Sequence, residues 1–388
     1  MSITDTLGLS NFSLYPHRTE DAQLREMQSA SFEKKIKSGI TQINDYKIEG
    51  INNDEDGTPK IVKIEMSADE VKKLADWIVY YKNKLIKEGK AEGIIKSSSN
   101  TTCPRSFQVT PEKNIIVHFN KNNETLIQKG RKSKIKLSLF LLFNTILARA
   151  TPRSEQADPK FSRRSVRQLS WSQRLGDNPY IIKIYKFHEF KSKRRFLKGQ
   201  LLMQFHRRGD LFTAIGKQTL TFKEKVIIAK KGLETLLALE KSQLIHRDIK
   251  PENILLNKNK EPVFADLELM CHMEEHEQRK KSCGTEWYFP PKYAEACNSA
   301  TRMDLTTPRR NVYEFGVTLA FLFYNSYIEE SKKKEPTYPC IIKALSMFKK
   351  YPQHQPLTHI IFGMIELDES KRLHPKRALE LFETTIPC

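Results

Sequence analysis

Several polar residues stand between two apolar runs in the segment LIHRDIKPENILL at 244–256. A carboxylate such as that of Asp248 can take a proton from a hydroxyl group, and Asn253 follows it five residues later. A second carboxylate, Asp266, follows the apolar residues VFA, 18 residues after Asp248. Oxygen atoms of Asn and Asp side chains suit magnesium. Asn253 and Asp266 are therefore of the residue types that suit a magnesium site.

The same segment resembles the catalytic loop of eukaryotic-type protein kinases, whose signature is H-R-D-L-x-x-x-N, with isoleucine here in place of leucine. For phosphoryl transfer, a protein must mainly position the reacting groups and neutralise the charge on the phosphates. The resemblance implies that Asp248 is the catalytic base and that Asn253 and Asp266 hold Mg²⁺ (or Mn²⁺) on ATP. It also implies that Lys250 contacts the transferring phosphate, a pattern typical of the serine/threonine class.

Other phrases extend the resemblance over about residues 110–385. GTEWYFPPK at 284–292 is similar to the end of an activation segment. NVYEFGVTLAFLF at 311–323 is similar to the central helix of the large lobe, and DESKRLHPKRALELF at 368–382 to its last helices. The resemblance therefore implies a complete large lobe.

LLMQFHRRGDLF at 201–212 resembles the hinge segment of the family. This resemblance implies that Met203 is the gatekeeper, and that Gln204 and His206, with the phenylalanine between them, face the adenine of ATP.

The phosphate-binding side of the small lobe departs from the family. A glycine-rich loop lets backbone amides approach phosphates, because glycine lacks a side chain. The best match here, QKGRKSKI at 128–135, keeps only Gly130. Basic residues such as Lys132 and Lys134 could bind the phosphates by charge instead. An ordinary basic β-turn is the alternative.

Arginine stands where the family carries its phosphate-anchoring lysine. When TILAR is matched to V-A-I-K, Arg149 takes the lysine position, and its planar fork differs from an ammonium group. Gln168 takes the place of the partner glutamate on the small-lobe helix, which leaves a hydrogen bond but no ion pair. Alternatively Lys134 or Lys136, from the preceding strand, anchors the phosphates.

Departures from the family also occur in the large lobe. Leu267 and Glu268 replace the phenylalanine and glycine of D-F-G. Asn311 stands where the central helix of the family carries an aspartate that braces the catalytic loop. An asparagine can still accept a hydrogen bond there, but without charge.

The fold class that we predict is α+β, a bilobal protein-kinase-like fold with a mainly helical N-terminal extension. A strand-rich block with one helix, followed by a helix-rich block, suggests two lobes. We predict an extension of mixed helix and strand at 1–105 that braces the small lobe, the small lobe at 106–203 and the large lobe at 204–388. Strands are expected at 114–119, 134–143, 145–151, 180–190 and 196–205, and helices at 19–37, 67–89, 165–176 and 222–243.

The net charge of +20 at pH 7 favours polyanionic partners. Basic residues gather on the small-lobe helix and on the turn that the family fold places beside it. This patch comprises Arg163, Arg164, Arg167, Lys191, Lys193, Arg194 and Arg195. It fits a compact polyanion such as an inositol polyphosphate or a phosphoinositide head group, which could act as an activator. A solvated face is the alternative, and nucleic acid is disfavoured because few aromatic residues accompany the patch.

The chain shows no apolar stretch of the roughly 18–20 residues that a membrane span needs, and we expect at most peripheral membrane contact. Its N-terminus lacks the pattern of a secretory signal. Six cysteines without a framework spacing fit a reducing compartment. We therefore expect a cytoplasmic place of action. In style the chain resembles bacterial effector kinases that reach host cells without a cleavable signal peptide.

These residues predict an ATP-dependent kinase that phosphorylates serine or threonine in a protein substrate. Retention of Asp248, Asn253 and Asp266 favours catalysis, because these residues touch the metal and the acceptor. One alternative is a pseudokinase scaffold that binds a partner protein or anionic lipid. Another is a kinase-fold transferase that uses a non-protein acceptor or transfers a nucleotidyl group.

Overall fold

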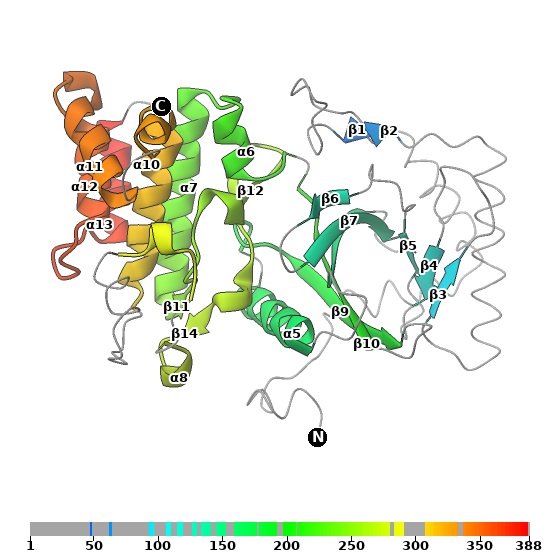
Figure 1. Cartoon of the computed structure of the whole chain (residues 1–388). Helices are drawn as coiled ribbons and strands as arrows, with labels where there is room; N and C mark the ends of the chain where they lie inside the picture. The colour runs from blue at the N-terminus through cyan, green and yellow to red at the C-terminus, as the bar shows by residue number, and fades with distance from the viewer. Residues whose placement is uncertain are drawn as a thin grey trace. The chain divides into compact units, whose positions relative to one another are not determined.

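The computed structural model describes the strands β1 to β7 and, beyond them, residues 145–152, 159–176, 178–191, 197–206, 208–279, 283–290, 307–332 and 337–386. The chain divides into two compact units, drawn together in Figure 1. Unit 1 comprises residues 1–169 and 184–205, and unit 2 comprises residues 170–183 and 206–388.

Unit 1 is built on an antiparallel sheet. Its strand order is β3-β4-β5-β7-β8-β10-β9, and β6 also pairs with β7. Figure 1 shows β9 and β10 as long neighbouring strands. The strands are β3 (Gly93–Lys96), β4 (Ser106–Val109), β5 (Ile115–His118), β6 (Leu126–Lys129), β7 (Ser133–Phe140), β8 (Thr145–Pro152), β9 (Ile184–Lys191) and β10 (Leu197–Gln204). The short strands β1 (Lys47–Ile48) and β2 (Val62–Lys63) pair with each other.

The strands expected from the sequence appear in this sheet within a few residues of their expected ends. The division expected between residues 105 and 106 falls between β3 and β4, which pair with each other. The sheet therefore continues across that position. The helices expected at 19–37 and 67–89 lie outside the described residues.

The helix α5 (Pro159–Arg174), whose residues up to Leu169 belong to unit 1, begins six residues before its expected start at 165. Proline suits the first turn of a helix, since its missing N–H needs no partner there. The ring of Phe161 lies 6.5 Å from the ring of Phe187 on β9. A Cβ atom at Gly199 of β10 would lie 2.7 Å from Phe187 and 3.2 Å from Phe161. The small residue thus lets the helix pack closely on this face of the sheet.

Unit 2 is mainly helical. Its helices are α6 (Leu211–Gly216), α7 (Phe222–Lys241), α8 (His276–Arg279), α10 (Arg309–Lys332), α11 (Thr337–Phe348), α12 (Gln355–Met364) and α13 (Pro375–Thr385). Two short antiparallel pairs accompany them, β11 (Leu244–Ile245) with β14 (Cys271–His272) and β12 (Ile254–Leu256) with β13 (Pro262–Phe264). The helix α7 begins with a capping box in which Thr221 and Glu224 bond each other's backbone amides.

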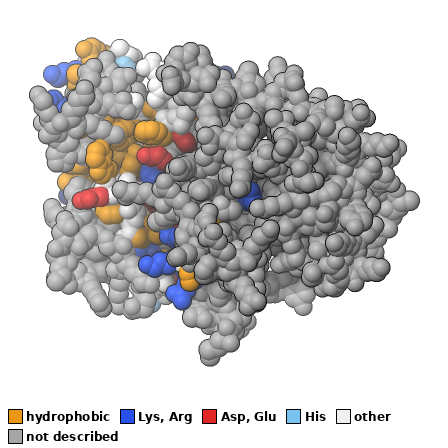
Figure 2. Space-filling view, turned by 45° about the vertical axis from the view of Figure 1, so that its right-hand side comes forward, with side chains coloured by type: hydrophobic (Ala, Val, Ile, Leu, Met, Phe, Trp, Pro, Cys, Tyr) orange, Lys and Arg blue, Asp and Glu red, His pale blue; other side chains and the backbone are white. Residues whose placement is uncertain are grey.

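The surface of the described residues is mixed in character. Figure 2 shows apolar side chains beside Lys, Arg, Asp and Glu side chains on one face. Among the described residues, the exposed large apolar side chains are Phe212, Phe222, Trp287, Met347 and Tyr351. Within the described part of the chain, no helix is both long enough and apolar enough to cross a membrane.

The helices α7 and α10 approach closely at Gly232. A Cβ atom there would lie 2.7 Å from Cε1 of Phe315, a ring that is fully buried. Because well-packed cores resist added volume, we expect Gly232→Ala to destabilise the protein by about 1–3 kcal/mol. Urea unfolding measures this change. Gly216→Ala is the matched control, since a Cβ atom at Gly216 meets nothing within 4 Å. Unchanged stability of Gly232→Ala would contradict the expectation.

Candidate active site

The segment between β11 and β12 carries the residues that the sequence singled out. After Ile245 the chain leaves β11, and Arg247 adopts a left-handed backbone conformation with φ of 72°. A short 3-10 helix, Pro251–Asn253, then leads into β12. A left-handed conformation is costly for a residue other than glycine, so the surrounding contacts must hold Arg247 in it.

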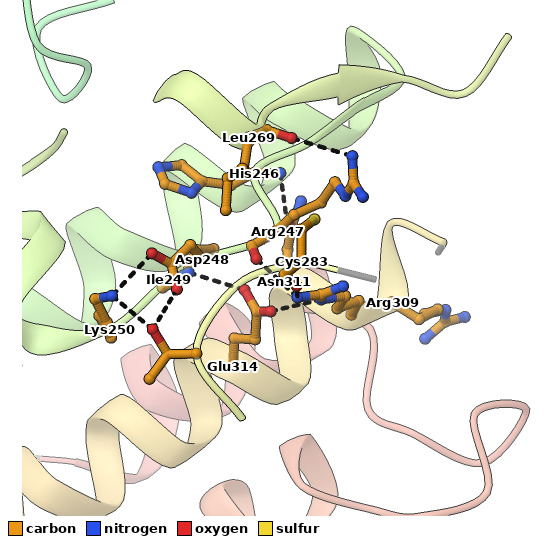
Figure 3. A network of polar contacts seen from close by, with 12 residues as sticks. His246, Arg247, Asp248, Ile249, Lys250, Leu269, Cys283, Arg309, Asn311 and Glu314 are labelled. Atoms are coloured by element: carbon orange, nitrogen blue, oxygen red, sulfur yellow. Dashed lines mark hydrogen bonds and ion pairs between the residues drawn. The ribbon is translucent and has the colours of Figure 1, made fainter. Parts of the chain in front are cut away.

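Asp248 lies in a compact group of side chains. Its Oδ1 accepts a hydrogen bond of 2.7 Å from the hydroxyl of Thr285, and its Oδ2 lies 2.8 Å from Nζ of Lys250. Nζ of Lys250 also donates to the Thr285 hydroxyl at 2.6 Å. The structure thus places a carboxylate, an ammonium group and a hydroxyl in mutual contact, as Figure 3 shows for Asp248 and Lys250.

Asn253 orients Asp248 and lies next to Asp266. Its Nδ2 donates to Oδ2 of Asp248 at 2.8 Å and to the Asp248 carbonyl at 2.9 Å. The amide of Ala265 donates to the Asn253 carbonyl at 2.8 Å, so the residue after it, Asp266, lies near Asn253. The β12–β13 register, which pairs Ile254 with Phe264, accounts for this proximity.

These two residues fit a magnesium ion. Because Nδ2 of Asn253 is engaged by Asp248, the amide oxygen is the atom that would face a cation. Asp266 adopts a left-handed conformation with φ of 57° and supplies a carboxylate. Hard oxygen donors of this kind are the ligands that Mg²⁺ prefers. No group of three or more His, Cys, Asp or Glu side chains that could hold a metal occurs among the described residues.

The carboxylate of Asp248 is kept ionised. Burial alone would raise its pKa, but the charge and hydrogen bond of Lys250, with the hydrogen bond from Thr285, hold the pKa below its ordinary value. Asp248 is therefore a charged acceptor at neutral pH, as a residue that orients a hydroxyl must be.

His246 is a neutral, buried support of the loop. Its Nε2 lies 3.1 Å from the carbonyl of Ala265, which can only accept, so Nε2 carries the proton. Burial lowers the pKa of His246 from 6.5 to about 4, against the opposing effect of Asp248. Its contact with Ala265 joins the catalytic loop to the segment that carries Asp266.

We expect the protein to lose stability as pH falls from about 6.5 to about 4, because the unfolded chain binds a proton at His246 in that range and the folded chain does not. The shift corresponds to roughly 3 kcal/mol at its full extent. His206, whose pKa burial also lowers to about 4, adds to the slope. Urea unfolding at several pH values should show a flatter dependence for His246→Gln, whereas the exposed His359→Gln should keep the wild-type slope.

The central helix α10 braces the loop with two kinds of contact. Oδ1 of Asn311 accepts from the His246 amide at 3.0 Å, and its Nδ2 donates to the Leu244 carbonyl at 3.2 Å. The expected hydrogen bond from this position is thus present. A second support, the buried pair of Arg310 and Glu314, was missed by sequence reasoning. Two charges four residues apart within a long apolar helix were the available signal.

In unit 1, Arg149 has a different amide partner from the expected Gln168. Its Nη1 donates to Oε1 of the buried Gln200 at 3.4 Å. Arg149 pairs with Leu202 in the β8–β10 register, so these side chains and Gln200 share one face. Phe161 of α5 packs on the other face, beside Gly199. Because Gln168 also belongs to α5, the register explains why Arg149 pairs elsewhere. Burial lowers the pKa of Arg149 to about 10.

The remaining small-lobe candidates stay predictions. Gly130 and Lys132 lie outside the described residues. Lys134 and Lys136 are on β7, where the register places them opposite Thr151 and Arg149. Met203 and Gln204 end β10, and His206 begins the second segment of unit 2.

Comparison with known proteins places the chain in a family. Residues 123–381, about two thirds of the chain, match the family described as protein kinase domain. The mouse phosphorylase b kinase gamma catalytic chain, liver/testis isoform, is 33% identical over 127 residues, which are 32% of this chain and 30% of that protein. Aurora kinase A-B of Xenopus laevis is 28% identical over 237 residues, 59% of this chain and 54% of that protein.

Human ribosomal protein S6 kinase alpha-3 is 27% identical over 191 residues, which are 48% of this chain and 24% of that protein. The chain thus spans between a quarter and about half of the length of these relatives. The family match covers the whole segment in which the loop around Asp248, the neighbouring Asn253 and Asp266, and the central helix lie. The chain belongs to the protein kinase family.

Proposed function

We propose that the protein transfers the γ-phosphoryl group of ATP to serine or threonine hydroxyls of a protein substrate. The hydrogen bond of 2.7 Å from the Thr285 hydroxyl to Oδ1 of Asp248 carries this proposal. It supports the view that the carboxylate can bind and orient a hydroxyl group where Lys250 is also within reach. A substrate hydroxyl would take a similar position.

Each residue has one role in the proposed reaction. Asp248 orients the acceptor hydroxyl and takes its proton as the hydroxyl oxygen bonds to the γ-phosphorus of ATP, while the bond to the bridging oxygen breaks and ADP leaves. Lys250, within 2.8 Å of Asp248, offsets the negative charge of the transferring group. Asn253 and Asp266 would hold Mg²⁺ or Mn²⁺, which neutralises charge on the phosphates when bound.

Transfer from labelled ATP tests the proposal. Wild type, Asp248→Ala and Asp266→Ala are incubated with labelled ATP, Mg²⁺ or Mn²⁺, and a general protein substrate. We expect label from wild type alone, and intact mass spectrometry should show addition of phosphate. Addition of a nucleotide would instead support the alternative transferase. No label from any of the three proteins, even with substrate proteins from several sources, would favour a pseudokinase scaffold.

A polyanion is a further candidate ligand, as an activator of the proposed kinase. The 16 residues of α5 include five Lys or Arg side chains and no acidic side chain, which favours an anionic partner. Lys191 ends β9, whereas Lys193, Arg194 and Arg195 lie outside the described residues. Inositol hexakisphosphate should raise the melting temperature and the transfer rate. Equal values with and without it would exclude this role.

We also infer a cytoplasmic place of action. The six cysteines of the sequence lack the spacing of a disulfide framework, which fits a reducing compartment. The similarity in style to bacterial effector kinases suggests the same compartment inside a host cell. Fractionation of cells that express the tagged chain tests this, and recovery only from the extracellular medium would contradict it.

A further inference from the structure

A buried ion pair lies within one turn of α10. Nε of Arg310 lies 2.6 Å from Oε1 of Glu314, and the two side chains are only 2% and 1% exposed. Desolvation of two charges often costs as much as their attraction contributes, so a buried pair is weak support for a role in stability alone. The contacts of the pair suggest another role.

Both partners bond the catalytic loop on either side of Asp248. Nη2 of Arg310 donates to the carbonyl of Arg247 at 2.7 Å. Oε2 of Glu314 accepts from the amide of Ile249 at 2.8 Å. The two peptide units that flank Asp248 are therefore both held from the same pair, as Figure 3 shows for Glu314 and Ile249.

The pair also reaches the activation segment. Nη2 of Arg310 donates to the carbonyl of Cys283 at 2.8 Å, and the Arg310 guanidinium lies 4.8 Å from the ring centre of Phe289. Two residues after Cys283, Thr285 bonds Asp248 directly. One guanidinium thus joins the segment that carries Thr285 to the loop that carries Asp248.

The charges of Arg310 and Glu314 add to the support that the uncharged side chain of Asn311 gives the catalytic loop. Asn311 supports the loop before Asp248, at His246 and Leu244, through an uncharged amide. Hydrogen bonds to charged groups are about twice as strong as those between neutral groups. Glu314 and Arg310 therefore supply the charge-assisted contacts that the amide of Asn311 cannot supply.

We propose that Arg310 and Glu314 form a positioning pair that fixes Asp248 through its two flanking peptide units and couples it to the activation segment at Cys283. The pair does not touch the reacting atoms. As far as it concerns catalysis, this inference rests on the proposed function.

Two measurements test the pair, and one of them needs no activity. Hydrogen exchange of the full chain reports on the amides of 244–256, and steady-state kinetics reports on kcat and on KM for ATP. The variants are Arg310→Met, Glu314→Leu and their combination, with Glu314→Gln as a milder change. The matched control is Arg377→Met with Glu380→Leu, a pair on α13 that is 62% and 44% exposed.

We expect exchange at 244–256 to accelerate about tenfold in each variant of the pair, with no such change in the control. We expect kcat to fall about tenfold or more while KM for ATP changes less than about twofold, because positioning acts on the reacting geometry. The double variant should lose no more activity than either single variant, since the residues act as a unit. Glu314→Gln keeps an acceptor for the Ile249 amide and should lose less than Glu314→Leu.

The outcomes separate this inference from the proposed function. Wild type could transfer no phosphate while hydrogen exchange at 244–256 is still faster in the variants of the pair. In that case the proposed function is wrong, but the pair still holds the loop in place. If hydrogen exchange at 244–256 is as slow in the variants of the pair as in the control variant, the inference is wrong. A lower melting temperature with unchanged kcat also overturns it, because the pair would then serve stability only. Should Glu314→Leu fail to fold, Arg310→Met provides the comparison, and Glu314→Gln should show a smaller effect in the same direction.

Discussion

Asp248→Asn is expected to lower kcat by roughly 10²–10⁴-fold, the range that a positioned general base contributes. The amide can turn its oxygen toward Lys250 and Asn253, but its NH₂ group then faces the Thr285 hydroxyl, which now loses the acceptor for its own proton. A substrate hydroxyl would meet the same donor. The change therefore removes both the base and the orienting acceptor, while it alters the volume of the side chain little.

Single-turnover and steady-state measurements with ATP and Mg²⁺ check this expectation. Asp368→Asn is the control, because the partly exposed carboxylate of Asp368 contacts only its sequence neighbours Ser370 and Lys371 among the contacts of the described residues. That variant should keep wild-type kcat. Retention of more than about a tenth of kcat by Asp248→Asn would show that the carboxylate is not the base.

Gly284→Ala is expected to impair both folding and activity. Gly284 has φ of 103°, where side chains other than hydrogen are strained. A Cβ atom there would collide with the Arg247 carbonyl and lie 2.7 Å from Nη2 of Arg310. Torsional strain and overpacking together should cost roughly 2–5 kcal/mol. Displacement of Thr285 by about 1 Å could lower kcat by about 10²-fold.

Gly209→Ala separates the two causes of the Gly284 effect. Gly209 has φ of 70°, but a Cβ atom there meets nothing within 4 Å. Its replacement should therefore cost only the torsional strain, about 1–2 kcal/mol, and leave kcat near the wild-type value. Thermal unfolding and kcat are measured for both variants. Equal losses in the two variants would show that the contact with Arg310 and Arg247 has no specific part.

The side chains that meet in the catalytic loop could be predicted from the sequence, because they lie close together along the chain. Asp248, Lys250 and Asn253 stand within six residues, and Asp266 follows a short strand that pairs with the strand after Asn253. A local motif of this kind determines which side chains meet in the loop, as the contacts of Asp248 with Lys250 and Asn253 show. The hydrogen bond of Asn311 to His246 was also accessible, because the family supplies an aspartate at that position.

Other features depend on information that a sequence pattern does not hold. The partner of Arg149 is set by strand register, because a shift of one residue moves every side chain to the other face. The role of Arg310 depends on two backbone carbonyls, those of Arg247 and Cys283. Because every residue has a backbone carbonyl, a sequence pattern cannot identify such partners. Charges spaced like Arg310 and Glu314 usually form exposed helix pairs, so burial was not foreseeable from spacing alone.

A shortened chain that begins at residue 106 would lose β3 and leave β4 as an unprotected edge strand, since β4 pairs with β3 on one side and β5 on the other. A start at 123, where the family match begins, would also remove β4 and β5 and uncover the edge of β7 that β5 protects. Open edges present unpaired N–H and C=O groups that promote self-association. The soluble catalytic fragment of this protein should therefore begin before Gly93, well ahead of the limits that family similarity suggests.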